Sequence, residues 1–282
     1  MGGIDSARDF AITTRRNLLK LLSASPAIGL GAALPGALHA QAAAAGLLTG
    51  NVCTLMPEVT EGPYYIDPGL IRADIREDKP GIALDLRLQV VSADCQPIES
   101  ARVDIWHCDA QGNYSGFSGQ GSDTTSDTAG LTFLRGTQMT DAAGITAFQT
   151  IYPGWYRGRT THIHFKVFLD ETTVLTGQIF FPDALSQYLY DNAPDYLRDG
   201  SRDTINRNDN IAAQAGPGAY AYIREQPEGY QAALVIGIDP EAQSTQSGPA
   251  GGPPPGGGNP PGPPPGDSDS PPNPEALIPG LG

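Results

Sequence analysis

The chain has 282 residues, of which 17% are charged, and a formal net charge of −14 at neutral pH. Such an acidic surface repels nucleic acid and anionic membranes, so we exclude both as partners. The length allows one large or two small domains, but both ends have compositions unlike a packed core, which favours one compact domain.

The N-terminal segment 1–42 has the pattern of a twin-arginine (Tat) export signal. Arg15 and Arg16 precede an apolar run rich in Ala, Gly and Leu. The run includes serines, a proline and glycines and is marginal against the roughly 20 apolar residues of a spanning helix, so we expect cleavage rather than a retained anchor. Ala40 and Ala42 form an A-x-A pair, which predicts cleavage after Ala42. Removal of this segment, with four basic and two acidic residues, takes the net charge from −14 to −16.

The mature protein is therefore expected in the periplasm or the medium, after transient contact with the Tat export machinery and without stable membrane insertion. Three cysteines, Cys53, Cys95 and Cys108, fit an oxidising compartment with one disulfide and one thiol, and the sequence leaves the pairing open. The chain contains no C-x-x-C motif, the main signal of a zinc ribbon or a thioredoxin.

Residues 43–243 are predicted to form an all-β domain. In 82–91, leucines alternate with Asp85, Arg87 and Gln89, as expected for a strand with one buried face. Similar apolar runs separated by Gly, Asp and Pro predict further strands at 101–106, 131–134, 145–151, 161–169, 174–181 and 230–238. About seven or eight mainly antiparallel strands with long loops indicate a β-sandwich. Helical spacing within 183–198 predicts one or two short helices, and the Pro/Gly-rich segment 244–282 is predicted to be a disordered tail.

Two of the three histidines left after signal cleavage form a His-Ile-His motif. Because residues two apart on a strand share a face, His162 and His164 present two imidazoles together, while Ile163 faces the opposite side. Alone, this motif is weak, since a solvated strand face explains it equally well. It predicts half of a metal site only if other ligands accompany it.

Two tyrosines in turn-forming contexts are the candidate companions. Tyr65 ends Thr-Glu-Gly-Pro-Tyr-Tyr, and Tyr156 ends Pro-Gly-Trp-Tyr shortly before the histidines. Singly, each tyrosine is better explained as a buried aromatic with a bonded hydroxyl. Two phenolates and two imidazoles together form a hard, anionic ligand set that favours Fe(III) over Fe(II) and matches zinc poorly.

Five segments together resemble the intradiol ring-cleavage dioxygenases, in the order found in that family. They are TEGPYY, ARVDIWHCDAQGNYSGF, FLRGTQMTDAAGITAFQTIYPGWY, GRTTHIHF and GQIFFP, and the resemblance spans roughly residues 53–182. The resemblance implies an enzyme that inserts both atoms of O2 into a catechol and opens the ring between the hydroxylated carbons to give a muconate-type diacid. It implies Fe(3+) and no organic cofactor.

The resemblance also implies roles for individual residues. Tyr65, Tyr156, His162 and His164 would hold the iron, with Tyr156 as the ligand that leaves when substrate binds. Arg159 would steady charge that develops on the substrate ring, and Gln178 would lie beside the substrate. His107, in Trp-His-Cys-Asp, would stay outside the metal site as a packing residue.

The sequence departs from the better-known family members in two places. Only a short segment separates the predicted signal from Tyr65, so the helical dimer region of intracellular catechol dioxygenases is expected to be absent, and the oligomeric state stays open. The loop 157–161 is short, which predicts a more open substrate site.

Two other classes of β-sandwich protein share parts of this pattern. A copper/zinc superoxide dismutase needs more histidines than the three that remain. A non-catalytic β-sandwich that binds aromatic or carbohydrate ligands is the alternative that the sequence leaves open.

Overall fold

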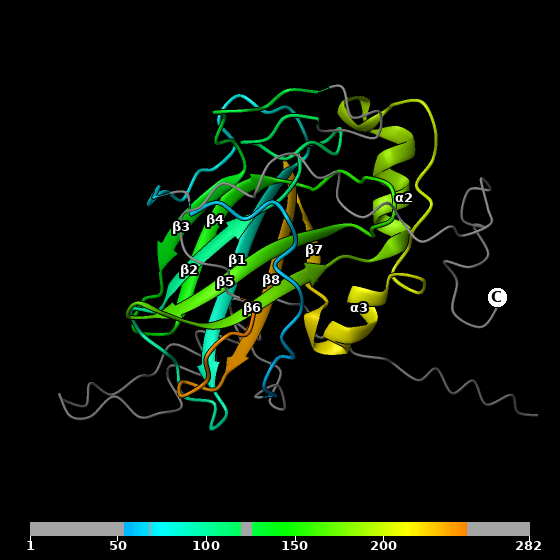
Figure 1. The fold of residues 1–282 in the computed structure, drawn as a ribbon. Helices are drawn as coiled ribbons and strands as arrows, with labels where there is room; N and C mark the ends of the chain where they lie inside the picture. Colours follow the sequence, from blue (N-terminus) through cyan, green and yellow to red (C-terminus); the bar gives the residue numbers. More distant parts are fainter. Residues whose placement is uncertain (1–53, 68, 120–125, 247–282) are drawn as a thin grey trace, which may run out of the picture. The chain divides into compact units, whose positions relative to one another are not determined.

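Two four-stranded sheets make up most of the structure (Figure 1). The computed structural model describes residues 54–67, 69–119 and 126–246; the predicted signal, and the tail beyond residue 246, lie outside these ranges. The strands are β1 (Ala83–Ser92), β2 (Arg102–Trp106), β3 (Arg135–Met139), β4 (Ile145–Ile151), β5 (His162–Leu169), β6 (Thr172–Phe180), β7 (Tyr222–Gln226) and β8 (Gly229–Ile238). One sheet has the order β4-β1-β8-β7, and the other, which we call the site sheet, has the order β3-β2-β5-β6. The predicted all-β sandwich is confirmed.

Alternating side chains from the two sheets form the core between them. Leu84, Leu86 and Leu88 of β1 are 0–1% exposed and belong to the same buried cluster as Ile163 and Phe165 of β5. Full burial of one such side chain stabilises the fold by about 1.5–3 kcal/mol relative to leaving it exposed. The alternation read from the sequence is therefore the pattern that packs the sandwich.

The strand pairing is antiparallel except where β1 and β8 run parallel. In the site sheet, His164 of β5 lies opposite Trp106 on β2 and opposite Gln178 on β6. This register puts side chains of three strands around one point on the outer face of the sheet.

The outer face of the site sheet is polar yet buried. His162, His164 and Lys166 alternate with the core residues of β5, and each is 2% exposed. Buried polar groups need partners, so another part of the chain has to cover this face.

Two strands differ from the prediction. The expected strand at 131–134 is wrong: β3 begins at Arg135, and Leu134 has a φ of 56°, which is incompatible with an extended strand. Phe133 and Leu134 are buried from a loop instead. Strand β7 was not predicted, because its residues are half-buried or exposed and show no apolar alternation.

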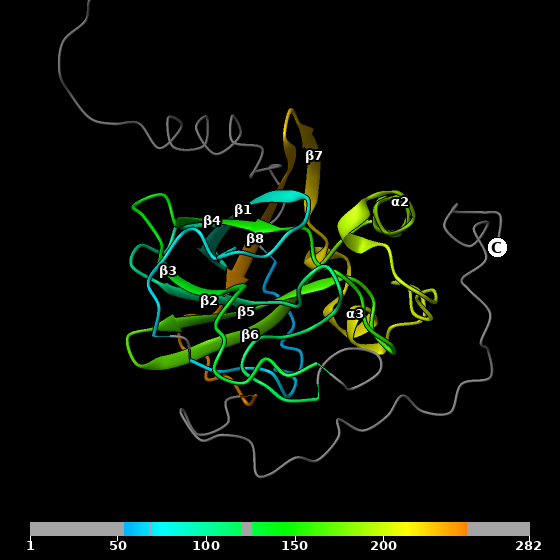
Figure 2. The same cartoon turned by 90° about the horizontal axis from the view of Figure 1, so that it is seen from above.

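Two α-helices in the described ranges flank the sheets. Helix α2 (Asp183–Asn192) and a short 3-10 helix (Pro194–Tyr196) confirm the helical prediction for 183–198. Helix α3 (Asn210–Ala215) was not predicted. Both α-helices lie on the same side of the two sheets, as Figures 1 and 2 show. No helix in the described part of the chain is long and apolar enough to cross a membrane.

Ordered contacts continue slightly past the predicted start of the tail. The Ser244 amide donates to the Thr173 carbonyl, and the Thr245 amide donates to the Glu58 carboxylate over 3.0 Å. The boundary of the domain therefore lies at least two residues beyond residue 243.

Candidate metal centre

Two imidazole nitrogens and two phenol oxygens converge on one point at the outer face of the site sheet. The Nε2 atoms of His162 and His164 lie 3.1 Å apart. The Tyr114 hydroxyl is 3.2 Å from His162 Nε2 and 3.1 Å from His164 Nε2. The Tyr156 hydroxyl is 3.1 Å from His162 Nε2 and 3.4 Å from the Tyr114 hydroxyl. We call these four residues the His/Tyr cluster.

The spacing within the cluster fits a metal ion. Ligand atoms about 2.0–2.1 Å from a metal, in tetrahedral or similar geometry, are separated by about 3.0–3.4 Å. The His162 Nδ1 atom lies 2.6 Å from the Thr160 carbonyl, which can only accept, so Nδ1 carries the proton and the Nε2 lone pair faces the cluster. The donor set is chemically suited to a hard cation.

Both imidazoles of the cluster are kept neutral. Burial, assisted by the Arg159 guanidinium, lowers the pKa of His162 to about 3. Burial and then the neighbouring His162 lower the pKa of His164 well below its ordinary value. Neutral imidazole is the form that binds a metal, so these nitrogens are ready to act as ligands near neutral pH.

Tyr65, which the sequence analysis expected among the metal ligands, lies outside the His/Tyr cluster. Its hydroxyl donates to Asp104 Oδ2 over 2.9 Å, and its ring packs against Trp106 with centroids 4.8 Å apart. Burial raises the pKa of Tyr65 far above its ordinary value, as it does that of Tyr114, so the hydrogen-bond partners and not the pKa values distinguish the two tyrosines. Tyr114 occupies the place in the cluster that the sequence analysis gave to Tyr65.

A tight turn brings Tyr114 to Tyr156. The Asp109 carboxylate accepts from the amides of Gln111 and Asn113 at 3.0 and 2.9 Å, which closes the turn after β2. Gly112 has a φ of 86°, and a Cβ there would lie 2.3 Å from the Trp155 carbonyl oxygen. Only glycine allows the turn to approach the segment that carries Tyr156 so closely.

The signal for Tyr114 was present in the sequence but ambiguous. Tyr114 follows Gly112-Asn113 within one of the five quoted segments. Tyr65 also follows a Gly-containing turn, and both tyrosines are distant in sequence from the histidines. The choice between them depends on long-range folding and not on a local pattern.

A strap formed by residues 60–65 covers the buried polar face of the site sheet. Each strand of the sheet binds the strap through one side chain, as follows: Asp104 of β2 accepts from the Tyr65 hydroxyl, Arg135 of β3 donates to the Tyr64 carbonyl, Lys166 of β5 pairs with Glu61, and Gln178 of β6 donates to the Thr60 carbonyl. A Cβ added at Gly62 would lie 3.4 Å from His164 Cε1, so the strap runs directly over this imidazole. The quoted segment TEGPYY therefore covers the His/Tyr cluster and contributes none of its four residues.

Arg159 and Gln178 lie beside the cluster. Arg159 places one terminal nitrogen 3.5 Å from His162 Nε2 and donates with the other to Gln178 Oε1 over 2.5 Å. Its Nε donates to Asp209 Oδ2 over 2.9 Å. The structure thus brings both predicted polar residues to the site and adds Asp209, which the sequence analysis missed.

His107 lies outside the cluster with both ring nitrogens occupied. Nδ1 is 2.8 Å from the Cys108 carbonyl and Nε2 is 2.7 Å from the Thr150 hydroxyl. Burial lowers the pKa of His107 to about 4, so the ring is neutral and structural. The predicted packing role agrees with this arrangement.

The described cysteines have different states. Cys108 is a buried free thiol, and Cys95 is disulfide-bonded. Cys53 lies outside the described residues.

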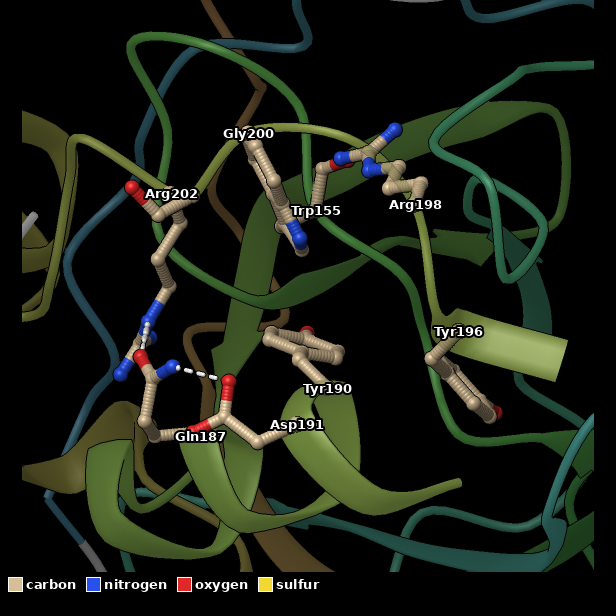
Figure 3. Close-up of a pocket in the computed structure, with 9 residues that line it drawn as sticks. Trp155, Gln187, Tyr190, Asp191, Tyr196, Arg198, Gly200 and Arg202 are labelled. Atoms are coloured by element: carbon tan, nitrogen blue, oxygen red, sulfur yellow. Dashed lines mark hydrogen bonds between the residues drawn. The ribbon is translucent and has the colours of Figure 1, made fainter. Parts of the chain in front are cut away.

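A small cavity lies behind the segment that carries Tyr156. Figure 3 shows Trp155 and Tyr190 among the residues that line it, and Arg202 hydrogen-bonded to Gln187 at its wall. Its volume of ≈ 40 Å³ holds one or a few water molecules, which is too little for a catechol. Arg198 lies 3.7 Å from the centre of the Trp155 ring and supports this segment from outside the cluster.

Comparison with known proteins supports one family. The sequence model of a family described as dioxygenase matches residues 60–201. Over 199 residues, the chain is 29% identical to a catechol 1,2-dioxygenase of Acinetobacter baylyi, covering 62% of this chain and 60% of that protein. Over 168 residues, it is 31% identical to catechol 1,2-dioxygenase 2 of Acinetobacter lwoffii, covering 51% of this chain and 57% of that protein. The chain thus spans less than two thirds of the length of these relatives.

A solved structure gives a more complete match. The intradiol ring-cleavage dioxygenase from Tetranychus urticae is 36% identical, with a TM-score of 0.63, covering 69% of this chain and 98% of that one. The part of the chain that the family model matches, residues 60–201, includes the site sheet. All four residues of the His/Tyr cluster lie within it.

Proposed function

Because the chain belongs to the intradiol ring-cleavage dioxygenase family, we propose that it is an Fe(3+) enzyme that inserts both atoms of O2 into a catechol-type aromatic. The product would be a muconate-type diacid, formed by cleavage between the two hydroxylated carbons. The proposal rests on the His/Tyr cluster, in which neighbouring imidazole nitrogens and phenol oxygens lie 3.1–3.4 Å apart.

Tyr114, Tyr156, His162 and His164 would hold the iron. Two phenolates and two neutral imidazoles favour the ferric ion, because hard anionic oxygens match its charge. When bound, the ferric ion would act as a Lewis acid that favours loss of the catechol protons, and the resulting catecholate ring is more electron-rich than neutral catechol.

The two tyrosines differ in a way that suggests different roles. Tyr114 is 1% exposed and is enclosed by the turn after β2, whereas Tyr156 is only half-buried at the start of the loop 157–160. Burial raises the pKa of Tyr156, and the adjacent Arg159 guanidinium opposes this rise. We therefore propose that the Tyr156 phenol oxygen would take a proton from a catechol hydroxyl, while Tyr114 would keep a purely metal-holding role.

Arg159 and Gln178 would act on the substrate ring. The Arg159 guanidinium is fixed next to His162, where it can stabilise negative charge that develops on a bound ring. Gln178 holds Arg159 through its Oε1 and the strap through its Nε2, so its amide has a fixed orientation at the site. These contacts favour positioning roles in addition to direct contact with substrate.

The substrate range follows from the short loop between Tyr156 and the histidines. Because this loop is short and Arg157 is exposed, we propose that the site is open and accepts several catechols. The test measures O2 uptake and ring-opened products with catechol, hydroxyquinol, protocatechuate and larger plant-type catechols. We expect turnover of at least two of these classes. Turnover of protocatechuate alone would contradict the open site, and no uptake by iron-loaded protein would instead favour a non-catalytic binding module.

We also propose export by the twin-arginine route, which carries folded proteins and so suits a protein that loads its metal before export. The disulfide-bonded Cys95 supports an oxidising destination. Changing both Arg15 and Arg16 to lysine is expected to leave the protein in the cytoplasm, as measured by cell fractionation. Unchanged export of this variant would reject the proposed route.

A further inference from the structure

The loop that carries Arg159 is held by a segment outside the part of the chain that the family model matches. The match ends at residue 201, and three polar side chains at every third position follow it: Asp203, Asn206 and Asp209. The Gly158 amide donates to Asp203 over 2.9 Å, and the Thr160 hydroxyl donates to Asn206 over 2.8 Å. We call segment 203–209 the clamp.

Asp209 uses its two carboxylate oxygens for different tasks. Oδ1 accepts from the amides of Ile211 and Ala212 at 2.8 and 3.0 Å, which caps the N-terminus of α3. Oδ2 accepts from Arg159 Nε and from the Thr160 amide, both at 2.9 Å. The side chain is 1% exposed, so this carboxylate is committed to these partners.

Arg159 has fixed contacts at Nε and at one terminal nitrogen. Asp209 holds Nε, Gln178 holds one terminal nitrogen at 2.5 Å, and the other terminal nitrogen lies 3.5 Å from His162 Nε2. Arg159 is largely buried, and a guanidinium removed from water is destabilised unless a carboxylate compensates its charge. Asp209 therefore fixes the orientation of the Arg159 side chain and also compensates its positive charge.

We infer that Asp209 is a positioning residue for the dioxygenase reaction, which holds Arg159 in the orientation that places one terminal nitrogen beside His162 of the His/Tyr cluster. This inference rests on the proposed function. Without the carboxylate, the Arg159 side chain can rotate toward solvent, which removes its charge from the point where substrate charge develops. Displacement of a preorganised donor by about 1 Å can lower a rate about 100-fold.

The variant Asp209→Asn separates the two tasks of the carboxylate. Asparagine caps helices about as well as aspartate, so its oxygen can keep the Ile211 and Ala212 amides. Its NH2 group then replaces Oδ2 and cannot accept from Arg159 or Thr160. We expect kcat to fall about 10–100-fold, with a smaller change in KM, because the contact acts on developing charge.

Asp203→Asn is the matched control, since it removes the same charge from the clamp without touching Arg159. We expect its kcat to fall by less than about threefold, as for a substitution away from the reacting groups. In an Arg159→Gln background, Asp209→Asn should lower kcat no further, because its target is already gone. Asp209→Asn with wild-type kcat, or a full additional loss in that background, would overturn the inference.

Thermal unfolding of the metal-free protein provides a second readout that does not depend on activity. The losses of Tm caused by Asp209→Asn and Arg159→Gln should be clearly less than additive when combined. If wild-type protein shows no dioxygenase activity but this coupling is present, the proposed function fails while the Asp209–Arg159 contact stands. Additive losses of Tm would reject the contact itself.

Discussion

Replacing Tyr114 with phenylalanine is expected to remove iron from the protein and to abolish dioxygenase activity. The Tyr114 hydroxyl lies 3.1–3.2 Å from the Nε2 atoms of His162 and His164, so the substitution removes one of the four proposed protein ligands. The expected fall in iron affinity is more than about 100-fold, above the range for residues that only support a ligand. Metal analysis after dialysis against a chelator, together with O2 uptake, measures both effects.

Tyr65→Phe is the matched control for this variant. It removes one phenol hydroxyl from the same region, but that hydroxyl donates to Asp104 and not to the histidines. We expect iron and visible colour to be retained, with a loss of about 1–2 kcal/mol in the free energy of unfolding from the broken hydrogen bond to a carboxylate. Iron loss from Tyr65→Phe and retention by Tyr114→Phe would return the ligand assignment to Tyr65.

Replacing Lys166 with methionine is expected to lower the free energy of unfolding by about 2–3 kcal/mol. The Lys166 side chain is 3% exposed, pairs with Glu61 of the strap and lies 4.2 Å from the centre of the Tyr65 ring. Breaking a buried ion pair costs about 3–5 kcal/mol because one charge loses its partner, and we lower this value because Glu61 is 19% exposed. Urea unfolding of the metal-free protein measures the change.

Two further variants test whether the ion pair is the cause. The double change Lys166→Met with Glu61→Leu should recover most of the lost stability, because no uncompensated charge remains. Lys79→Met removes a more exposed lysine that pairs with Asp109 at 3.4 Å and is expected to cost no more than about 1 kcal/mol. If the double variant is no more stable than Lys166→Met alone, loss of packing and not of charge pairing explains the effect.

The sequence predicted the elements whose side chains alternate. Strand β4 was predicted with the bounds that the structure shows, because its buried and exposed residues alternate along most of its length. Strand β3, Arg-Gly-Thr-Gln-Met, has a polar outer face that is buried under the strap. Its sequence therefore lacks the alternation of apolar and polar residues that predicts a strand. Burial of a polar face depends on a distant segment, and no local pattern records it.

In the site, too, residues placed by local strand geometry were predicted, and residues placed by long-range folding were not. His162 and His164 were recognised because strand geometry alone places residues two apart on one face. Tyr65 was chosen and Tyr114 overlooked because both depend on how the strap and the turn after β2 fold against β5. Asp209 was overlooked for the same reason, since it lies about 50 positions from its partner Arg159.

The most direct test of the dioxygenase assignment is the visible absorption spectrum of the purified wild-type protein, recorded before and after addition of a catechol under air. We expect a red-purple band from tyrosinate bound to Fe(3+), which shifts when catechol is added and then decays as O2 is consumed. A protein that stays colourless after ferric loading would contradict the account, because the His/Tyr cluster would then not hold the metal on which the proposed reaction depends.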